Sequence, residues 1–168
     1  MYTYVIIDDE PLIRRGTKKK LEPLSHLLTC CGEASDGREG LELVRQLKPD
    51  IVILDMQMPV MDGTELLPAL SEEFPSTALI VISGFQNFDY MKQAISSKVI
   101  DYILKPFSKD EIQQTVLKTI DSLKDKEAED HHLTSMVQEK EEAFYSLDLK
   151  LLTDFLLGYT DTAHSSVS

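Results

Sequence analysis

The sequence predicts a doubly wound α/β fold, in which helices cover both faces of a parallel sheet. Five short apolar runs alternate with segments of helical spacing along the first two-thirds of the chain, and this alternation is typical of that fold class. Three of the runs are almost continuously apolar, as expected for strands that are buried on both faces. The connections are short and carry turn-forming pairs such as Asp36-Gly37, Asp62-Gly63 and Ser83-Gly84.

The expected strands are, in chain order, YVII (4–7), LLTCCGEA (27–34), IVILD (51–55), ALIVIS (78–83) and VIDYILK (99–105). The segments that follow them place apolar residues at the three- and four-residue spacing of a helix face. These residues are Leu12, Ile13, Leu21, Leu24 and Leu27 for the first expected helix, Leu41, Leu43, Val44 and Leu47 for the second, Leu66, Leu67 and Leu70 for the third, Phe88, Met91, Ala94 and Ile95 for the fourth, and Ile112, Val116, Leu117 and Ile120 for the fifth.

The pattern changes near residue 123. The following segment is acidic and has neither proline nor glycine before Gly158, which favours a long helix. Leu133, Val137, Phe144, Leu147 and Leu151 follow mostly alternating steps of four and three, with Lys140 interrupting them. Residues 123–158 are therefore either a helical connector with a weak coiled-coil seam or a solvated helix whose last turns dock elsewhere, and disorder is a third alternative. We expect the tail, 159–168, to be disordered.

Composition restricts the possible partners. The 168 residues suffice for one domain plus an appendage, and the formal net charge of -12 argues against binding of a nucleic-acid backbone by this chain. The only cysteines, Cys30 and Cys31, are neighbours in an expected strand, and we interpret them as buried thiols in a reducing compartment. We find no signal peptide and no apolar stretch long enough to span a membrane, so we expect a cytoplasmic protein without membrane contact.

Polar residues follow the expected strands at their carboxyl ends, where open parallel sheets bind ligands. Asp8 and Asp9 follow the first strand, Asp55 ends the third, Ser83 the fourth and Lys105 the fifth. Two ionised carboxylates about 4 Å apart repel each other by roughly 4 kcal/mol at an effective dielectric constant of about 20, so such a cluster needs a cation. Mg²⁺ fits, because it prefers oxygen ligands and keeps open positions for phosphoryl oxygens.

Asp55 is the best candidate nucleophile, because it stands alone at a strand end and a carboxylate can form an aspartyl phosphate. Lys105 and the Ser83 hydroxyl could then contact phosphoryl oxygens. Each residue also has an ordinary interpretation: Asp55 as a helix cap, the acids 8–10 as a favourable helix start, and Lys105-Pro106 as any strand end. Four such coincidences at successive strand ends favour a phosphoryl-transfer site.

Four motifs, VIIDDEP, DIVILDMQMPVMDG, VISGF and DYILKPF, occur in an order and spacing that resemble the receiver domain of two-component response regulators over about residues 2–122. The resemblance implies a (βα)5 flavodoxin-like fold, with Asp55 as the acceptor of a phosphoryl group from a sensor histidine kinase. It also implies Mg²⁺ held by Asp9, Asp55 and the backbone carbonyl of Gln57, with help from Asp8.

The resemblance further implies that Ser83 and Lys105 sense the phosphoryl group and that Lys105-Pro106 is a candidate cis peptide. Tyr102 corresponds to an aromatic residue that turns inward when the hydroxyl residue is drawn to the phosphate. An exposed strand tyrosine is the alternative. Many relatives have glycine at the position of Lys98, after the fourth helix, where glycine permits a positive φ.

The stretch SGFQNFDYMKQAISSKVIDYILKPF is similar to YesN-like regulators, in which a helical connector leads to an AraC-type DNA-binding domain. We therefore expect a receiver domain at 1–122 and a connector at 123–158, in a chain truncated before its output domain. DNA would be bound only through that missing domain. A homodimer could form through the face of the fourth helix, fifth strand and fifth helix, or through the C-terminal helix.

Three functions are compatible with these residues. The favoured one is a phosphorylation-controlled switch in transcription control that is not an enzyme. The first alternative is a small Mg²⁺-dependent phosphatase with an aspartyl-phosphate intermediate, although the chain has no evident substrate cap. The second is a structural module that only dimerises, against which the intact Asp9, Asp55 and Lys105 set argues.

Overall fold

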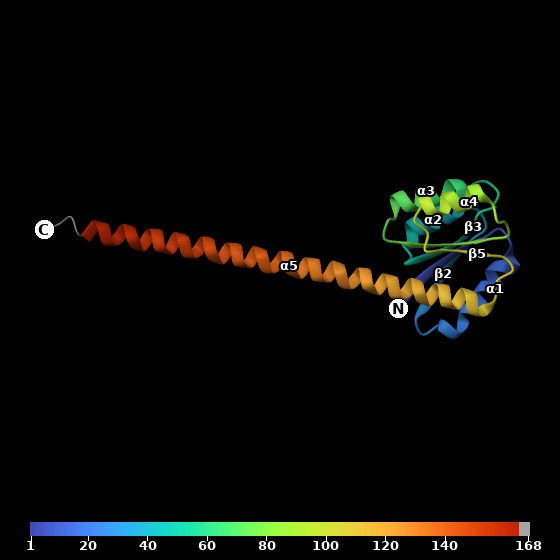
Figure 1. The fold of residues 1–168 in the computed structure, drawn as a ribbon, viewed down its shortest axis with the longest axis horizontal. Helices are drawn as coiled ribbons and strands as arrows, with labels where there is room; N and C mark the ends of the chain where they lie inside the picture. The colour runs from blue at the N-terminus through green and yellow to red at the C-terminus, as the bar shows by residue number, and fades with distance from the viewer. Residues whose placement is uncertain (165–168) are drawn as a thin grey trace. The chain divides into compact units, whose positions relative to one another are not determined.

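The computed structural model describes the backbone of residues 1–164 and the side chains of residues 1–157. Five strands and five α-helices alternate along the chain, with one short 3-10 helix, η1, after the first helix (Figure 1). Their bounds are β1 Tyr2–Ile7, α1 Pro11–Leu21, η1 Glu22–Leu24, β2 Leu28–Ala34, α2 Gly37–Leu47, β3 Ile51–Asp55, α3 Gly63–Glu73, β4 Ala78–Ser83, α4 Phe88–Ser96, β5 Asp101–Leu104 and α5 Lys109–His164.

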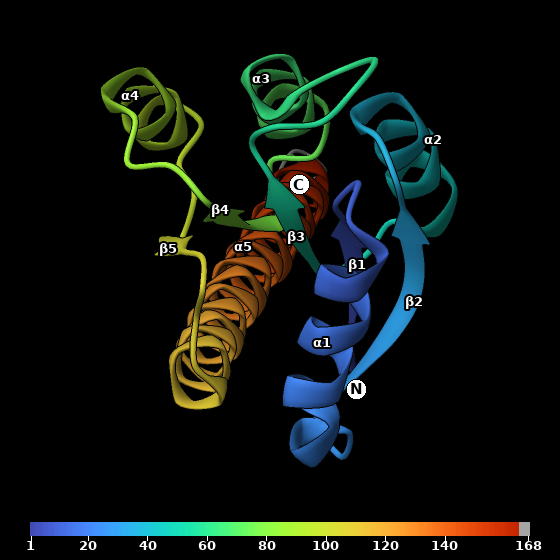
Figure 2. The same ribbon diagram turned by 90° about the vertical axis from the view of Figure 1, so that its right-hand side faces the viewer.

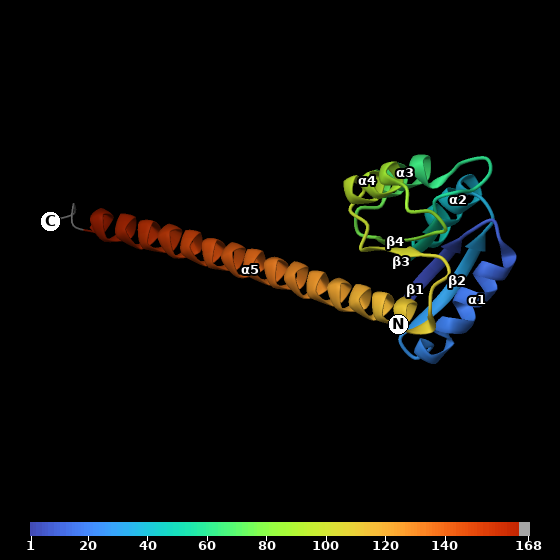
Figure 3. The same cartoon turned by 45° about the vertical axis from the view of Figure 1, so that its right-hand side comes forward.

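The five strands form one parallel sheet in the order β2-β1-β3-β4-β5. This is the flavodoxin-like, doubly wound arrangement expected from the sequence, and strand order reverses between β1 and β3. Helices α2, α3 and α4 cover one face of the sheet, while α1 and the first turns of α5 cover the other (Figures 2 and 3).

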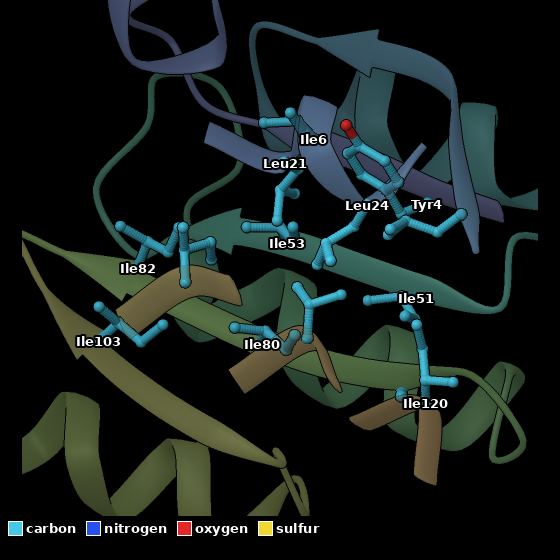
Figure 4. Packing of buried hydrophobic residues seen from close by; sticks show 14 of the residues in the cluster. Tyr4, Ile6, Leu21, Leu24, Ile51, Ile53, Ile80, Ile82, Ile103 and Ile120 are labelled. Carbon is cyan, nitrogen blue, oxygen red and sulfur yellow. The ribbon is translucent and has the colours of Figure 1, made fainter. Parts of the chain in front are cut away.

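Alternating side chains of the central strands fill two separate cores. In β3, Ile51 and Ile53 face α1 and α5, whereas Val52 and Leu54 face α2 and α3. Figure 4 shows the first core, in which the isoleucines of β3 and β4 meet Leu21 and Ile120. Every residue of β3 and β4 is buried, which confirms that the continuous apolar runs mark strands covered on both faces.

Two of the predicted turn pairs are helix starts. The Asp36 carboxylate accepts a hydrogen bond from the backbone N–H of Glu39 at 2.8 Å, and the Asp62 carboxylate accepts one from that of Thr64 at 2.9 Å. Each aspartate therefore caps the helix that begins at the following glycine.

Some expected bounds are wrong: α1 ends at Leu21, so Leu24 lies in η1 and Leu27 precedes β2 instead of belonging to the first helix. The fifth strand is shorter than 99–105, so Lys105 lies just beyond it. In α4 only Ala94 is buried, while Phe88 and Ile95 are 79% and 76% exposed. Leu12 is also exposed. Spacing identifies the apolar face of a helix, but whether a neighbour covers that face depends on the tertiary packing.

Cys30 and Cys31 are free thiols on β2, as expected, but each is half-buried rather than fully buried. They point to opposite faces of the sheet, one toward each core. Burial is the main cause that raises the pKa of both thiols, which makes them less reactive.

The chain divides into two compact units, Met1–Leu123 and the segment from Lys124 onward. Helix α5 continues to His164, so the predicted disorder from residue 159 is wrong for 159–164, where no proline ends the helix. The remainder of the expected tail, 165–168, lies outside the described residues. Among the helices of the described chain, none is long and apolar enough to cross a membrane.

Lys98 adopts the left-handed conformation that glycine favours. Its φ is 56°, and its backbone N–H donates to the carbonyl of Ile95 at 3.1 Å after α4 ends. The turn therefore forms without glycine, at a cost of roughly 1–2 kcal/mol for a residue with a Cβ atom.

We expect Lys98→Gly to stabilise the chain by about 1 kcal/mol, because glycine adopts this conformation without the steric cost. Chemical denaturation at neutral pH measures the change in the free energy of unfolding. Lys92→Gly is the matched control, since this exposed lysine lies inside α4, and it should destabilise the chain by about 1 kcal/mol. Equal destabilisation by both substitutions would contradict the argument.

Candidate functional site

The sheet register brings the predicted site residues to one edge. Ile7 of β1 pairs with Leu54 of β3, so Asp8 and Asp55 both follow directly after paired residues. Asp55 pairs in turn with Ile82, the neighbour of Ser83. Because the strands are parallel, their carboxyl ends lie at the same edge of the sheet.

Lys105 reaches this edge from the end of β5. Its neighbour Leu104 pairs with Ser83, and the backbone N–H of Lys105 donates to the carbonyl of Ser83 at 2.8 Å. The Lys105-Pro106 peptide bond is cis, as expected. The four strand ends that were singled out in the sequence therefore meet.

Four acids form a cluster at this edge. Asp8, Asp9, Glu10 and Asp55 each offer one carboxylate oxygen, and these oxygens lie within 4.8 Å of one another. Asp8 and Asp55 are buried, while Asp9 and Glu10 are exposed. The Asp8 carboxylate also accepts a hydrogen bond from the backbone N–H of Glu10 at 2.9 Å, which fixes the turn that carries the acids.

Lys105 compensates the buried part of this charge. Its Nζ donates to Asp8 Oδ2 at 2.8 Å and to Asp55 Oδ2 at 3.2 Å, and lies 3.6 Å from Glu10 Oε1. Burial acts to lower the pKa of Lys105, but the hydrogen bond to Asp8 and the charge of Asp55 outweigh it and hold that pKa above its ordinary value.

Asp55 is an unusually weak acid. Burial raises its pKa from 3.8 to about 6, and the neighbouring charge of Asp8 adds to this, although Lys105 acts in the opposite direction. Such a raised pKa, caused by burial and by a like charge, is characteristic of functional carboxylates. A cation placed beside Asp55 would favour its ionised form.

A hollow of about 460 Å³ opens over the carboxylate. It is lined by Asp9, Glu10, Asp55, Gln57, Met58, Gly84, Phe85 and Lys105. Asp55 is only 5% exposed, yet it faces this hollow, so a phosphoryl group has room beside it. A second hollow, of about 550 Å³ between β5 and the start of α5, contains none of the clustered acids.

Ser83 and Tyr102 share one partner. The fully buried Ser83 accepts a hydrogen bond on Oγ from the backbone N–H of Phe85 at 3.3 Å. The Tyr102 hydroxyl donates to the backbone carbonyl of Phe85 at 2.9 Å. Tyr102 is half-buried and packs beside the core under α4.

Gln57 lies at the rim. Its backbone N–H donates to Asp55 Oδ1 at 3.4 Å, and its side-chain amide donates to the Tyr90 hydroxyl at 3.3 Å. The side chain is exposed and lines the hollow. Its backbone carbonyl, which the family resemblance implies as a metal ligand, belongs to the same turn after β3.

The sequence analysis missed two supporting residues. Glu10 belongs to the acid cluster, and the run of three acids was a signal for it. Arg14 Nη1 donates to the backbone carbonyl of Asp8 at 2.6 Å, while its Nε lies 3.3 Å from Glu33 Oε1. No spacing in the sequence indicates the contact between Arg14 and Glu33, because Arg14 lies on α1 and Glu33 on β2.

The cluster suits a hard divalent cation. Its donors are carboxylate oxygens, two of them on exposed residues that water can reach, and Mg²⁺ binds through few carboxylates while keeping several waters. All four acids of the cluster offer such an oxygen. The excess of four acids over one lysine at the site gives a net negative charge for the cation to offset.

The chain matches the family model described as "Response regulator receiver domain" over residues 4–117. It is 38% identical over 124 residues to the uncharacterized transcriptional regulatory protein YesN of Bacillus subtilis, covering 74% of this chain and 34% of that protein. It is 37% identical over 106 residues to the transcriptional regulatory protein HptR of Staphylococcus aureus, covering 63% of this chain and 41% of HptR. The chain thus spans between a third and a half of the length of these relatives.

Solved structures agree on the fold. The receiver domain of AraT, a response regulator from Geobacillus stearothermophilus, is 33% identical with a TM-score of 0.70, and the match covers 75% of this chain and 98% of that one. The family match ends at residue 117, near the boundary of the first compact unit at Leu123, and the similarities favour a signalling domain over a small phosphatase. Together with the strand-end site, they show that the chain belongs to the receiver domain family of two-component response regulators.

Proposed function

We propose that Asp55 accepts a phosphoryl group from a phosphohistidine of a sensor kinase, and that this modification switches the conformation of residues 1–122. The observation that carries the proposal is the position of Asp55: a buried carboxylate at a strand end that faces an open hollow, with Lys105 Nζ at 3.2 Å. Beyond assisting its own phosphorylation and dephosphorylation, the chain acts as a switch and not as an enzyme.

In the transfer, a carboxylate oxygen of Asp55 attacks phosphorus, and the bond from phosphorus to the donor nitrogen breaks. Asp8, Asp9, Asp55 and the backbone carbonyl of Gln57 would hold Mg²⁺, which supplies positive charge for the phosphoryl oxygens. Lys105 already lies against Asp55, so a small movement of Nζ brings it to a phosphoryl oxygen. Positioning and charge compensation are most of what phosphoryl transfer requires.

The switch follows from the shared partner of Ser83 and Tyr102. If the Ser83 hydroxyl turns to donate to a phosphoryl oxygen, it releases the backbone N–H of Phe85, whose carbonyl holds Tyr102. The loop between β4 and α4 can then shift, and Tyr102 can repack inward. Phosphorylation acts through its different affinity for two conformations.

The output would be transcription control through a DNA-binding domain outside this chain, in the cytoplasm. Residues 123–158 would connect the two. The face of α4, β5 and α5 would change its affinity for a partner or a second copy, and Phe88, Met91 and Ile95 are exposed apolar residues on α4. The C-terminal helix is the other candidate dimer interface.

Phosphorylation by a small-molecule phosphodonor with Mg²⁺ tests the proposal directly. We expect one phosphoryl group per chain, mapped by mass spectrometry to Asp55, and no labelling when Mg²⁺ is removed by a chelator. Labelling of another residue would overturn the assignment of the acceptor. Steady turnover of a phosphate ester would favour a phosphatase instead, and a failure to bind Mg²⁺ or beryllofluoride would favour a purely structural module.

A further inference from the structure

We propose that residues 133–151 of α5 pair with the same segment of a second copy of this chain as a parallel, in-register, two-stranded coiled coil. This deepens the C-terminal helix interface named above and does not rest on phosphorylation of Asp55, because the pairing uses none of the residues around that carboxylate. It specifies the partner, the orientation and the register of the C-terminal helix.

The seam is a stripe of apolar side chains that nothing in the described chain covers. Leu133, Val137, Phe144, Leu147 and Leu151 are each between 56% and 63% exposed. Their steps of four and three residues are the a and d spacing of a heptad, with position d at Leu133 and position a at Val137. Lys140 occupies one d position inside the stripe.

The surface of the helix contains a hole of the kind that coiled coils use. A hollow on the isolated helix is lined by Val137, Lys140, Glu141, Phe144 and Tyr145. In a heptad the first four of these hold positions a, d, e and a. Four residues in these positions form the hole that receives a d-position side chain in a parallel pair.

Lys140 of a second copy is the side chain that enters this hole. Its methylene groups can pack against Val137 and Phe144, while Nζ reaches the carboxylate of Glu141 at the rim. The lysine is therefore tolerated in the seam at a cost in stability, because Lys140 of the two copies share one layer and their like charges repel, while Glu141 at the rim offsets part of this cost.

Charges beside the seam select the parallel orientation. The flank at heptad position e carries Glu141 and Asp148, while the flank at position g carries Met136, Ala143 and Lys150. In a parallel pair the e flank of one helix faces the g flank of the other, so no acids meet. In an antiparallel pair the e flanks would face each other and bring Glu141 close to Asp148 of the second copy.

The ends of the seam are also marked. Residues 124–132 contain no large apolar side chain except histidine rings, and the next d position after Leu147 is Asp154. The other acids of the segment, Glu139 and Glu142, fall at heptad positions c and f, away from the seam. Repulsion between these solvated acids is largely screened by salt at separations beyond about 10 Å at 0.1 M ionic strength.

Sedimentation equilibrium of the unphosphorylated full chain tests the interface. We expect a monomer–dimer equilibrium in the micromolar range, weakened about 100-fold by Leu147→Asn, which removes one apolar side chain from each helix. Leu149→Asn is the matched control, since this leucine is also exposed but lies at heptad position f, and it should change the equilibrium less than about threefold. A monomer at every concentration, a larger assembly, or equal effects of the two substitutions would overturn the proposal.

Two further variants test the interface by effects that unfolding of the helix could not produce. Lys140→Leu should tighten the dimer about tenfold or more, because the charge leaves the seam; a weaker dimer would contradict the register. Leu133→Cys should form a disulfide between two copies under mild oxidation, with the wild type and its Cys30 and Cys31 as control. A retained dimer without this disulfide would overturn the parallel orientation.

Discussion

Asp55→Asn is expected to abolish phosphoryl acceptance and, at the same time, to stabilise the chain at neutral pH. The loss follows from removing the nucleophilic oxygen. The gain follows from the pKa of Asp55, which burial raises from 3.8 to about 6. Above pH 6 the wild type must hold an ionised carboxylate where the neutral form is preferred, and asparagine removes this cost.

The sign of the pH dependence follows from proton binding. Between the unfolded and the folded pKa of Asp55, the folded state binds more protons, so its contribution to stability falls as the pH rises through that window. We expect a gain of about 2 kcal/mol for Asp55→Asn at pH 8 and roughly half of it at pH 5. This gain is smaller than the full pKa shift of Asp55 would give, because the variant weakens the hydrogen bond from Lys105 Nζ to residue 55.

Chemical denaturation at both pH values measures this effect in the absence of Mg²⁺. Asp121→Asn, an exposed acid on α5, serves as the control and should change stability by less than about 0.5 kcal/mol. Adding Mg²⁺ should stabilise the wild type and remove most of the difference. A variant that is less stable than the wild type at pH 8 would contradict the account of Asp55.

Lys105→Met should destabilise the chain by about 3 kcal/mol at pH 8 without Mg²⁺. The substitution leaves the buried Asp8 and Asp55 without the cation that lies 2.8 and 3.2 Å from them, and removing one partner of a buried ion pair has this cost. Lys105 itself is charged in both states at this pH, since its pKa lies above its ordinary value when folded.

The loss should shrink as the pH falls. Without Lys105, the pKa of Asp55 rises further above 6, because the lysine is the main cause that lowers it, and protonation then relieves the unpaired charge. Mg²⁺ should bind at least as tightly as to the wild type, since Lys105 no longer competes for the carboxylates. This combination of lower stability and undiminished Mg²⁺ affinity distinguishes charge compensation from general damage to the fold.

Isothermal titration with Mg²⁺ and denaturation between pH 5 and 8 measure the two effects. Lys109→Met is the matched control, because this exposed lysine lies just beyond the site and should leave both quantities unchanged. Equal stability of Lys105→Met and the wild type at pH 8 would show that the acids do not depend on the lysine. Weaker Mg²⁺ binding would show that Lys105 positions the ligands instead.

The sequence alone predicted the sheet and the residues at its edge. A strand such as ALIVIS can be recognised from the sequence, because burial of each apolar side chain lowers the free energy of the folded state whatever the partner is. The parallel order then places the ends of β1, β3, β4 and β5 together, so Asp8, Asp55, Ser83 and Lys105 could be grouped without coordinates.

Helix coverage was less predictable. The spacing of Phe88, Met91 and Ile95 correctly marks one face of α4. It does not indicate that this face is open to solvent. The same limit applies to Leu12. Periodicity describes one element, whereas coverage depends on a second element that comes from elsewhere in the chain.

Contacts around the site required the tertiary structure. Arg14 on the Asp8 carbonyl, and Phe85 between Ser83 and Tyr102, join residues of different elements through backbone groups. Backbone donors and acceptors are the same at every residue, so the amino-acid type carries no information about such contacts. The sequence determined which strands are buried and which chemistry reaches the sheet edge. The three-dimensional packing alone decided which helix faces are covered and which side chains touch, because register and loop geometry set those distances.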